Sequence, residues 1–202
     1  VLDGTKTSTE WQAYIPNEQN IMSRNPQRGF ISSANQYPVD PTYPYYVHSN
    51  SYEAYRNRII NQRLSEMDEI TPADMMKLQN DNYSIQAAES LPFMLSSLDS
   101  ASLTNSEQKI VELLQSWDFV YSPESIAATY YEVWYNSLYR NIWDEMTSGT
   151  VALSRPSDFT TIKLMKTDSA LSFYDVQSTP EKEDLPTLIR QNFAKSIDMI
   201  DV

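Results

Sequence analysis

SPESIAATYYEVWYNSLYRNIWDEM, residues 122–146, is the stretch that decides the fold of this chain. Its large apolar side chains recur every three or four residues, which is the spacing of one face of an α-helix. They are Ile126, Tyr130, Val133, Trp134, Leu138, Ile142 and Trp143. Ser122 stands at the expected N-cap, Pro123 at the first helical position and Gly149 just past the end. The pattern therefore predicts a long helix over 123–146.

Helical periodicity continues through the rest of the chain after residue 51. Further helices are predicted from about Ser51, from Thr71, over 105–117, near 157–165 and over 185–200. The start at Thr71 is the sharpest, because an N-cap residue precedes Pro72 and Asp74. We expect that helix to continue through Ile85 and Ala88 until Pro92 kinks or ends it. The connections are short, which predicts that consecutive helices are antiparallel neighbours.

Residues 1–50 differ from the remainder, being rich in Pro, Asn, Gln, Ser and Tyr. Within them, residues 28–35 follow the Asn25-Pro26 turn signal and precede a proline-rich stretch, which predicts a short β-strand. The expected architecture is mainly α: an extended segment with a short strand over 1–50, and an antiparallel helical domain over 51–202. An isolated strand would be poorly anchored, because its backbone groups would lack partners.

Composition excludes several functions. The formal net charge of -12 repels phosphate backbones, so nucleic-acid binding is not expected. There is no cysteine, which removes disulfides, thiolate metal sites and a cysteine nucleophile. No apolar run approaches the roughly 20 residues that span a bilayer. The chain begins at Val1 without Met, which we interpret as the mark of an excised or processed fragment.

The residues alone reveal little chemistry. The single histidine, His48, has no partners from which to build a triad or a metal site, so we interpret it as an incidental loop residue. The acidic pairs Asp68-Glu69 and Asp144-Glu145 diverge by about 100° on a helix, which is typical of solvated faces. The aromatic and methionine stripes are more typical of a core than of a ligand pocket.

Several short motifs nevertheless occur in a particular order. They are WQAYIP at 11–16, NPQRGFI at 25–31, SANQ at 33–36, YRNRI at 55–59, TPADMM at 71–76, LQND at 78–81 and LLQSWD at 113–118. Together they resemble the penicillin acylase (penicillin amidase) family of N-terminal nucleophile hydrolases, over about residues 1–145. The resemblance implies an internal piece of the large subunit, whose 1–50 segment would join the αββα core of the complete enzyme.

In that family, a serine exposed by autocatalytic processing attacks the amide bond, and its own α-amino group acts as the base. An α-amine has a pKa near 8, so it can accept a proton near neutrality. Val1 has no nucleophilic side chain, so the resemblance implies that the serine lies outside this chain and that the chain alone is inactive. It also implies that Asn35 contributes to the oxyanion hole and that Arg58 helps to orient the active site.

The resemblance carries further expectations. The substrate would be an N-acyl compound such as a penicillin or an acyl-homoserine lactone, and the protein would be periplasmic or secreted. Its partners would be the small subunit and the rest of the large subunit. Calcium is common in the family, but Asp40 is out of register with the family's ligand, so no cofactor or metal is assigned. The alternative is a non-enzymatic helical binding or scaffold module of an exported protein.

Overall fold

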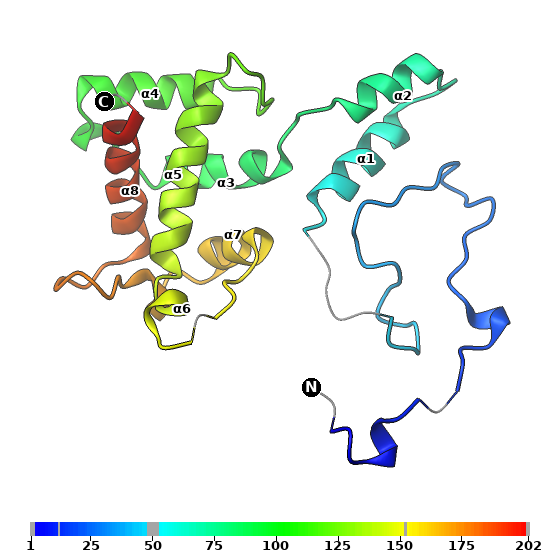
Figure 1. The fold of residues 1–202 in the computed structure, drawn as a ribbon. Helices are drawn as coiled ribbons and strands as arrows, with labels where there is room; N and C mark the ends of the chain where they lie inside the picture. The colour runs from blue at the N-terminus through cyan, green and yellow to red at the C-terminus, as the bar shows by residue number, and fades with distance from the viewer. Residues whose placement is uncertain (1–2, 12, 48–52, 152, 201–202) are drawn as a thin grey trace.

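The computed structural model describes residues 3–11, 13–47, 53–151 and 153–200 (Figure 1). Within these ranges the chain is mainly α-helical and contains no β-strand, which confirms the mainly α class. The helices are α1 (Tyr55–Glu66), α2 (Pro72–Gln79), α3 (Ile85–Ser96), α4 (Asn105–Gln115), α5 (Ile126–Ile142), α6 (Glu145–Ser148), α7 (Asp158–Thr167) and α8 (Leu185–Ile200). Short 3-10 turns cover Thr7–Thr9, Asn17–Gln19, Ser100–Ser102 and Ser172–Tyr174.

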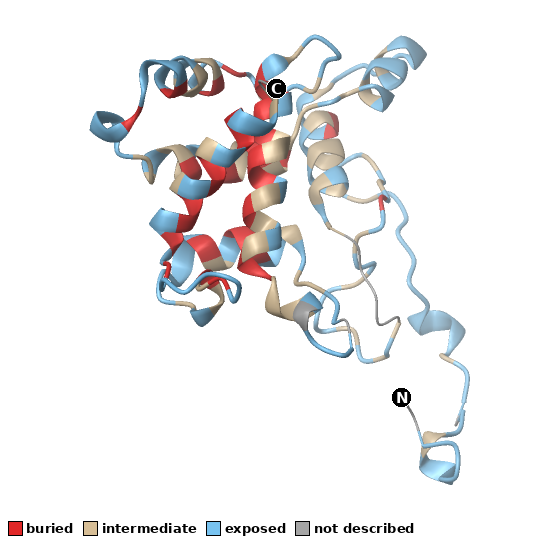
Figure 2. Cartoon of the chain, turned by 60° about the vertical axis from the view of Figure 1, so that its left-hand side comes forward, coloured by how far each residue is buried: buried red, intermediate tan, exposed pale blue. Residues whose placement is uncertain are grey.

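The core lies around α5. Helix α8 runs antiparallel beside α5, whereas α3 and α4 cross it (Figure 1). The apolar faces of these helices meet in one cluster, and Figure 2 colours buried residues red. Trp134 is fully buried at its centre, where its ring lies 4.7 Å from that of Phe193 and its indole N–H donates to the Ile189 carbonyl. The antiparallel pair at the centre thus joins two helices that are distant in sequence.

Side-chain caps explain where several helices begin. Thr71 caps α2, as the sequence predicted, and it also forms a reciprocal capping box with Asp74. Thr104 and Glu107 form a second capping box at the start of α4. Each box satisfies two backbone N–H groups that a helix terminus would otherwise leave unpaired.

The predicted start of the central helix at Pro123 is wrong by three residues. Ser125, not Ser122, is the N-cap, and its hydroxyl accepts from the Ala128 N–H. Residues 122–125 instead close a turn, with the Ser125 N–H donating to the Ser122 carbonyl. Ile126, expected on the buried face, is consequently 61% exposed. Ser122 and Ser125 are both residues that can cap a helix, and α5 begins after the second of them.

The single helix predicted from Thr71 to Pro92 is also wrong, because α2 ends at Gln79 and α3 begins at Ile85. The break is held by an antiparallel bridge between Tyr83 and Val120, which captures residues 82–84 for long-range pairing. Pro92 does not end α3, which continues to Ser96. Leu91 and Met94 are buried on either side of it, so burial offsets the lost backbone hydrogen bond.

The short strand predicted over 28–35 is absent. No backbone ladder reaches this stretch, because a strand requires a neighbouring strand and the described chain supplies none. Residues 3–11 and 13–47 instead form an irregular, largely exposed path, part of which passes beside α1 (Figures 1 and 2). Side-chain hydrogen bonds to α1 take the place of a ladder.

Candidate active-site segment

Asn35 lies on an exposed turn of the N-terminal segment. Its φ is 62°, the left-handed region that asparagine tolerates better than most residues. The turn is closed by Gln36, whose side-chain oxygen accepts from the Ala34 N–H at 2.7 Å and whose amide donates to the Ser32 carbonyl at 3.4 Å. Ala34 is buried beneath it. Local bonding therefore fixes the backbone conformation that presents the Asn35 amide.

Helix α1 holds this turn through two asparagines, Asn57 and Asn61, which are four residues apart and hence on one helix face. The Asn61 oxygen accepts from Arg28 at 3.0 Å and from the Ser32 hydroxyl at 2.6 Å. The Asn61 amide in turn donates to Asn57 at 2.7 Å. Side chains of α1 thus hold residues 28–35 of the segment without backbone pairing.

Arg56 contacts Asn35 directly. Its Nη1 donates to the Asn35 Oδ1 at 3.3 Å. A side-chain amide has one accepting end and one donating end. Because the arginine engages the accepting oxygen, this contact leaves the Asn35 NH₂ group unused. The donating end is the one an oxyanion would require.

Arg58 lies on the opposite face of α1. Two residues along a helix turn the side chain by about 200°, and Arg58 forms an ion pair with Glu89 of α3. The hydrogen bond from Arg58 lowers the pKa of the Glu89 carboxyl below its usual value. The structure therefore brings Asn35 together with Arg56, and places the predicted site residue Arg58 at the junction with the helical domain.

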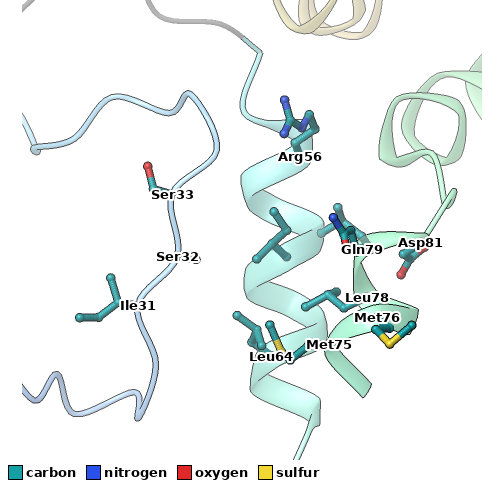
Figure 3. Close-up of a pocket in the computed structure, with 12 residues that line it drawn as sticks. Ile31, Ser32, Ser33, Arg56, Leu64, Met75, Met76, Leu78, Gln79 and Asp81 are labelled. Carbon is teal, nitrogen blue, oxygen red and sulfur yellow. The ribbon is translucent and has the colours of Figure 1, made fainter. Parts of the chain in front are cut away.

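An open groove of about 540 Å³ adjoins this site between the N-terminal segment, α1 and α2 (Figure 3). Arg56 stands at one end of the α1 wall and Leu64 at the other, with Ile59 and Ile60 between them. Met75, Met76 and Leu78 of α2 contribute further apolar lining, and Met76 is 66% exposed. The methionines predicted as core are thus surface residues of this groove.

Comparison with known families bears on this arrangement. The family model for penicillin amidase matches residues 1–201. The chain belongs to the penicillin amidase family. It therefore comes from a family of hydrolases, as the sequence motifs predicted. No individual curated protein matched the chain.

Two further residues of this penicillin amidase chain were considered from the sequence, His48 and Asp40. His48 lies outside the described residues. Asp40 accepts from the Thr42 N–H and hydroxyl in a local turn, and these bonds lower its carboxyl pKa. Within the described ranges, no three acidic or histidine side chains are grouped so as to hold a metal ion. None of the helices seen there has the length and apolar character needed to cross a bilayer.

Three residues important to the site were missed by sequence reasoning: Arg56, Asn57 and Asn61. The i, i+4 spacing of the two asparagines is a signal that could have found them, since it marks a polar stripe on a helix otherwise read by its apolar positions. The role of Glu89 could not be read locally, because it lies 31 residues from its partner Arg58.

Proposed function

We propose that this chain is part of an amidohydrolase that cleaves the amide bond of N-acyl substrates with an N-terminal serine located outside the chain. Family membership supports the reaction class. The observation that carries the role of this chain is the Arg56–Asn35 hydrogen bond, which leaves the asparagine NH₂ available as a donor. Residues 1–50 and 51–202 are proposed as two structural regions, the first completing the hydrolase core.

In the proposed reaction, the serine hydroxyl attacks the substrate carbonyl while the α-amino group accepts its proton. The carbonyl oxygen then carries a negative charge, and the Asn35 N–H donates to it. An amide suits this task because it stabilises charge without itself titrating. Collapse of this intermediate expels the amine, which takes the proton from the α-ammonium group, and leaves an ester of the acyl group with the serine. Water then hydrolyses this ester to release the acid and restore the serine. Arg56 would keep the Asn35 amide in the orientation that the intermediate requires.

We propose a hydrophobic acyl group on the substrate, such as a penicillin side chain or the chain of an acyl-homoserine lactone. The partners would be the small subunit and the remainder of the large subunit. The protein would be exported to the periplasm or secreted. Without the serine, the isolated 202-residue chain is expected to release no product from a chromogenic acyl-anilide.

The test is the turnover number of the complete, processed enzyme with Asn35→Ala. Removing one oxyanion donor is expected to lower kcat by about 10²–10³-fold. KM is expected to change much less, because the contact strengthens in the transition state. Asn20→Ala is a matched control, since it removes an exposed asparagine that lies outside the α1 contacts.

A fall in kcat of less than about threefold in correctly processed Asn35→Ala would refute the oxyanion assignment. Activity of the isolated chain that tracks the pure protein would refute the proposed location of the nucleophile. The two results are separable, because the first concerns a residue within the chain and the second concerns a group outside it.

A further inference from the structure

Helix α1 makes side-chain contacts with both the Asn35 segment and α3. Arg56, Asn57 and Asn61 face the segment that carries Asn35. Arg58 of the same helix binds Glu89 of α3. The two sets of contacts are rigidly related, because they belong to the same two turns of one helix.

A second contact fixes the same end of α1. The Glu53 carboxylate accepts from the Phe159 N–H in the first turn of α7, at 3.2 Å. A carboxylate at a helix N-terminus is favourable, because unpaired N–H groups and the helix dipole are positive there. The Tyr55 hydroxyl is enclosed at this junction. Glu53 and Glu89 thus hold the start of α1 against two different helices of the domain.

We propose that Glu89 is a positioning residue for the hydrolase site. It holds Arg58, which sets the placement of α1, and Arg56 on the same helix then places the Asn35 amide. This inference rests on the proposed function of Asn35. It assigns Arg58 an action through Glu89 and the helix, without contact with substrate.

The ion pair is half exposed, with side-chain exposures of 41% for Arg58 and 32% for Glu89. Such pairs contribute little to the free energy of unfolding. Catalysis is more sensitive, because displacing a catalytic group by about 1 Å can cost about 100-fold in rate. A change at Glu89 is therefore expected to reduce turnover much more than it reduces stability.

The test uses the complete processed enzyme. Glu89→Gln keeps the size of the side chain but removes its charge, and we expect kcat to fall roughly tenfold with KM nearly unchanged. Glu66→Gln is the matched control. Glu66 makes the same kind of contact with Arg63 of α1, at 3.7 Å, but within the helix, so it does not tie α1 to α3. Its kcat is expected to stay within about twofold of the parent.

Two combinations distinguish positioning from a general structural role. Charge exchange, Arg58→Glu with Glu89→Arg, is expected to recover most of the kcat that either single change loses. Glu89→Gln added to Asn35→Ala is expected to cause no further loss, because both act through one amide. If Glu89→Gln is not processed, Glu89→Asp replaces it, since this variant keeps the charge and shortens the reach.

Unchanged kcat in processed Glu89→Gln, or in its Asp replacement, would overturn the inference. So would a full additional loss in the Asn35→Ala background, or failure of charge exchange to recover kcat. These outcomes differ from failure of the proposed function, in which Asn35→Ala itself leaves kcat unchanged. In that case the positioning role falls as well.

Discussion

Replacement of Trp134 by alanine is the most direct perturbation of the helical core. Trp134 is 0% exposed on α5 and its ring contacts Phe193 of α8 at 4.7 Å. Its indole N–H also donates to the Ile189 carbonyl at 3.0 Å. The substitution therefore removes an aromatic contact, a hydrogen bond and a large buried volume at the point where the two central helices meet.

The expected cost is about 4 kcal/mol of unfolding free energy, within the roughly 3–5 kcal/mol typical of buried Trp or Phe to Ala changes. The hydrogen bond contributes at the low end of about 0.5–1.5 kcal/mol, because Ile189 lies within α8 and its carbonyl can pair along the helix. At about 2–4 °C per kcal/mol for a chain of this size, Tm is expected to fall by roughly 8–16 °C.

Urea and thermal unfolding of the purified chain, followed by far-UV circular dichroism, measure this cost. Trp11→Ala is the matched control, because Trp11 is 91% exposed and its loss is expected to change stability by less than about 0.5 kcal/mol. Trp134→Phe keeps the aromatic contact and is expected to cost about 1–2 kcal/mol. If Trp134→Ala lay within about 1 kcal/mol of the parent, the assignment of Trp134 to the centre of the core would be refuted.

Two further predictions test the charged cap of α4 and the anchor of the Asn35 segment. Burial opposes ionisation of Glu107, but hydrogen bonds from Arg190 and Thr104 outweigh it and hold its pKa below the ordinary 4.5. Glu107→Gln is thus expected to cost about 1–3 kcal/mol at neutral pH. The difference in unfolding free energy between parent and variant should vanish as the pH falls below 4.5 and through the lowered folded-state pKa. The control Glu112→Gln, at an exposed position, is expected to show neither effect. A difference that persisted in acid would contradict this prediction. Asn61→Ala removes the acceptor for Arg28 and Ser32, so NMR order parameters at residues 30–35 are expected to fall towards about 0.6. Gln62→Ala is the control, and unchanged order parameters in Asn61→Ala would count against the anchor.

Helix positions were predictable wherever local chemistry and burial agreed. The Thr71-Pro72-Asp74 start, the start of α4 at Asn105 and the apolar stripe over 185–200 correspond to observed elements. At the first two places a capping box favours one boundary, and over 185–200 the buried apolar stripe favours the observed helix. The sequence therefore contains sufficient information without knowledge of distant contacts.

Boundaries failed where a distant segment intervened. Residues 80–84 contain local capping residues, since Asp81 accepts from the Tyr83 N–H and Ser84 caps α3, and Tyr83 also pairs with Val120. The Tyr121 N–H also donates to the Asn82 carbonyl at 3.0 Å. Local propensity amounts to less than 1 kcal/mol per residue, so a few such long-range contacts override it. Periodicity alone does not contain this information.

Local sequence also did not show which of the two arginines of α1, Arg56 or Arg58, meets the Asn35 turn. Helical geometry places Arg56 and Arg58 on opposite faces, so one of them can meet the Asn35 turn while the other meets α3. The apolar residues Ile59 and Ile60 follow both faces and do not distinguish them. The helical positions of the asparagines do not distinguish them either, because Asn57 adjoins both arginines and Asn61 is three residues from Arg58 but five from Arg56. Only the hydrogen bonds that the asparagines make with Ser32 show where α1 meets the segment. The contact between this loop and the helix is therefore defined by side-chain hydrogen bonds from α1, whereas Arg58 pairs with Glu89 of α3.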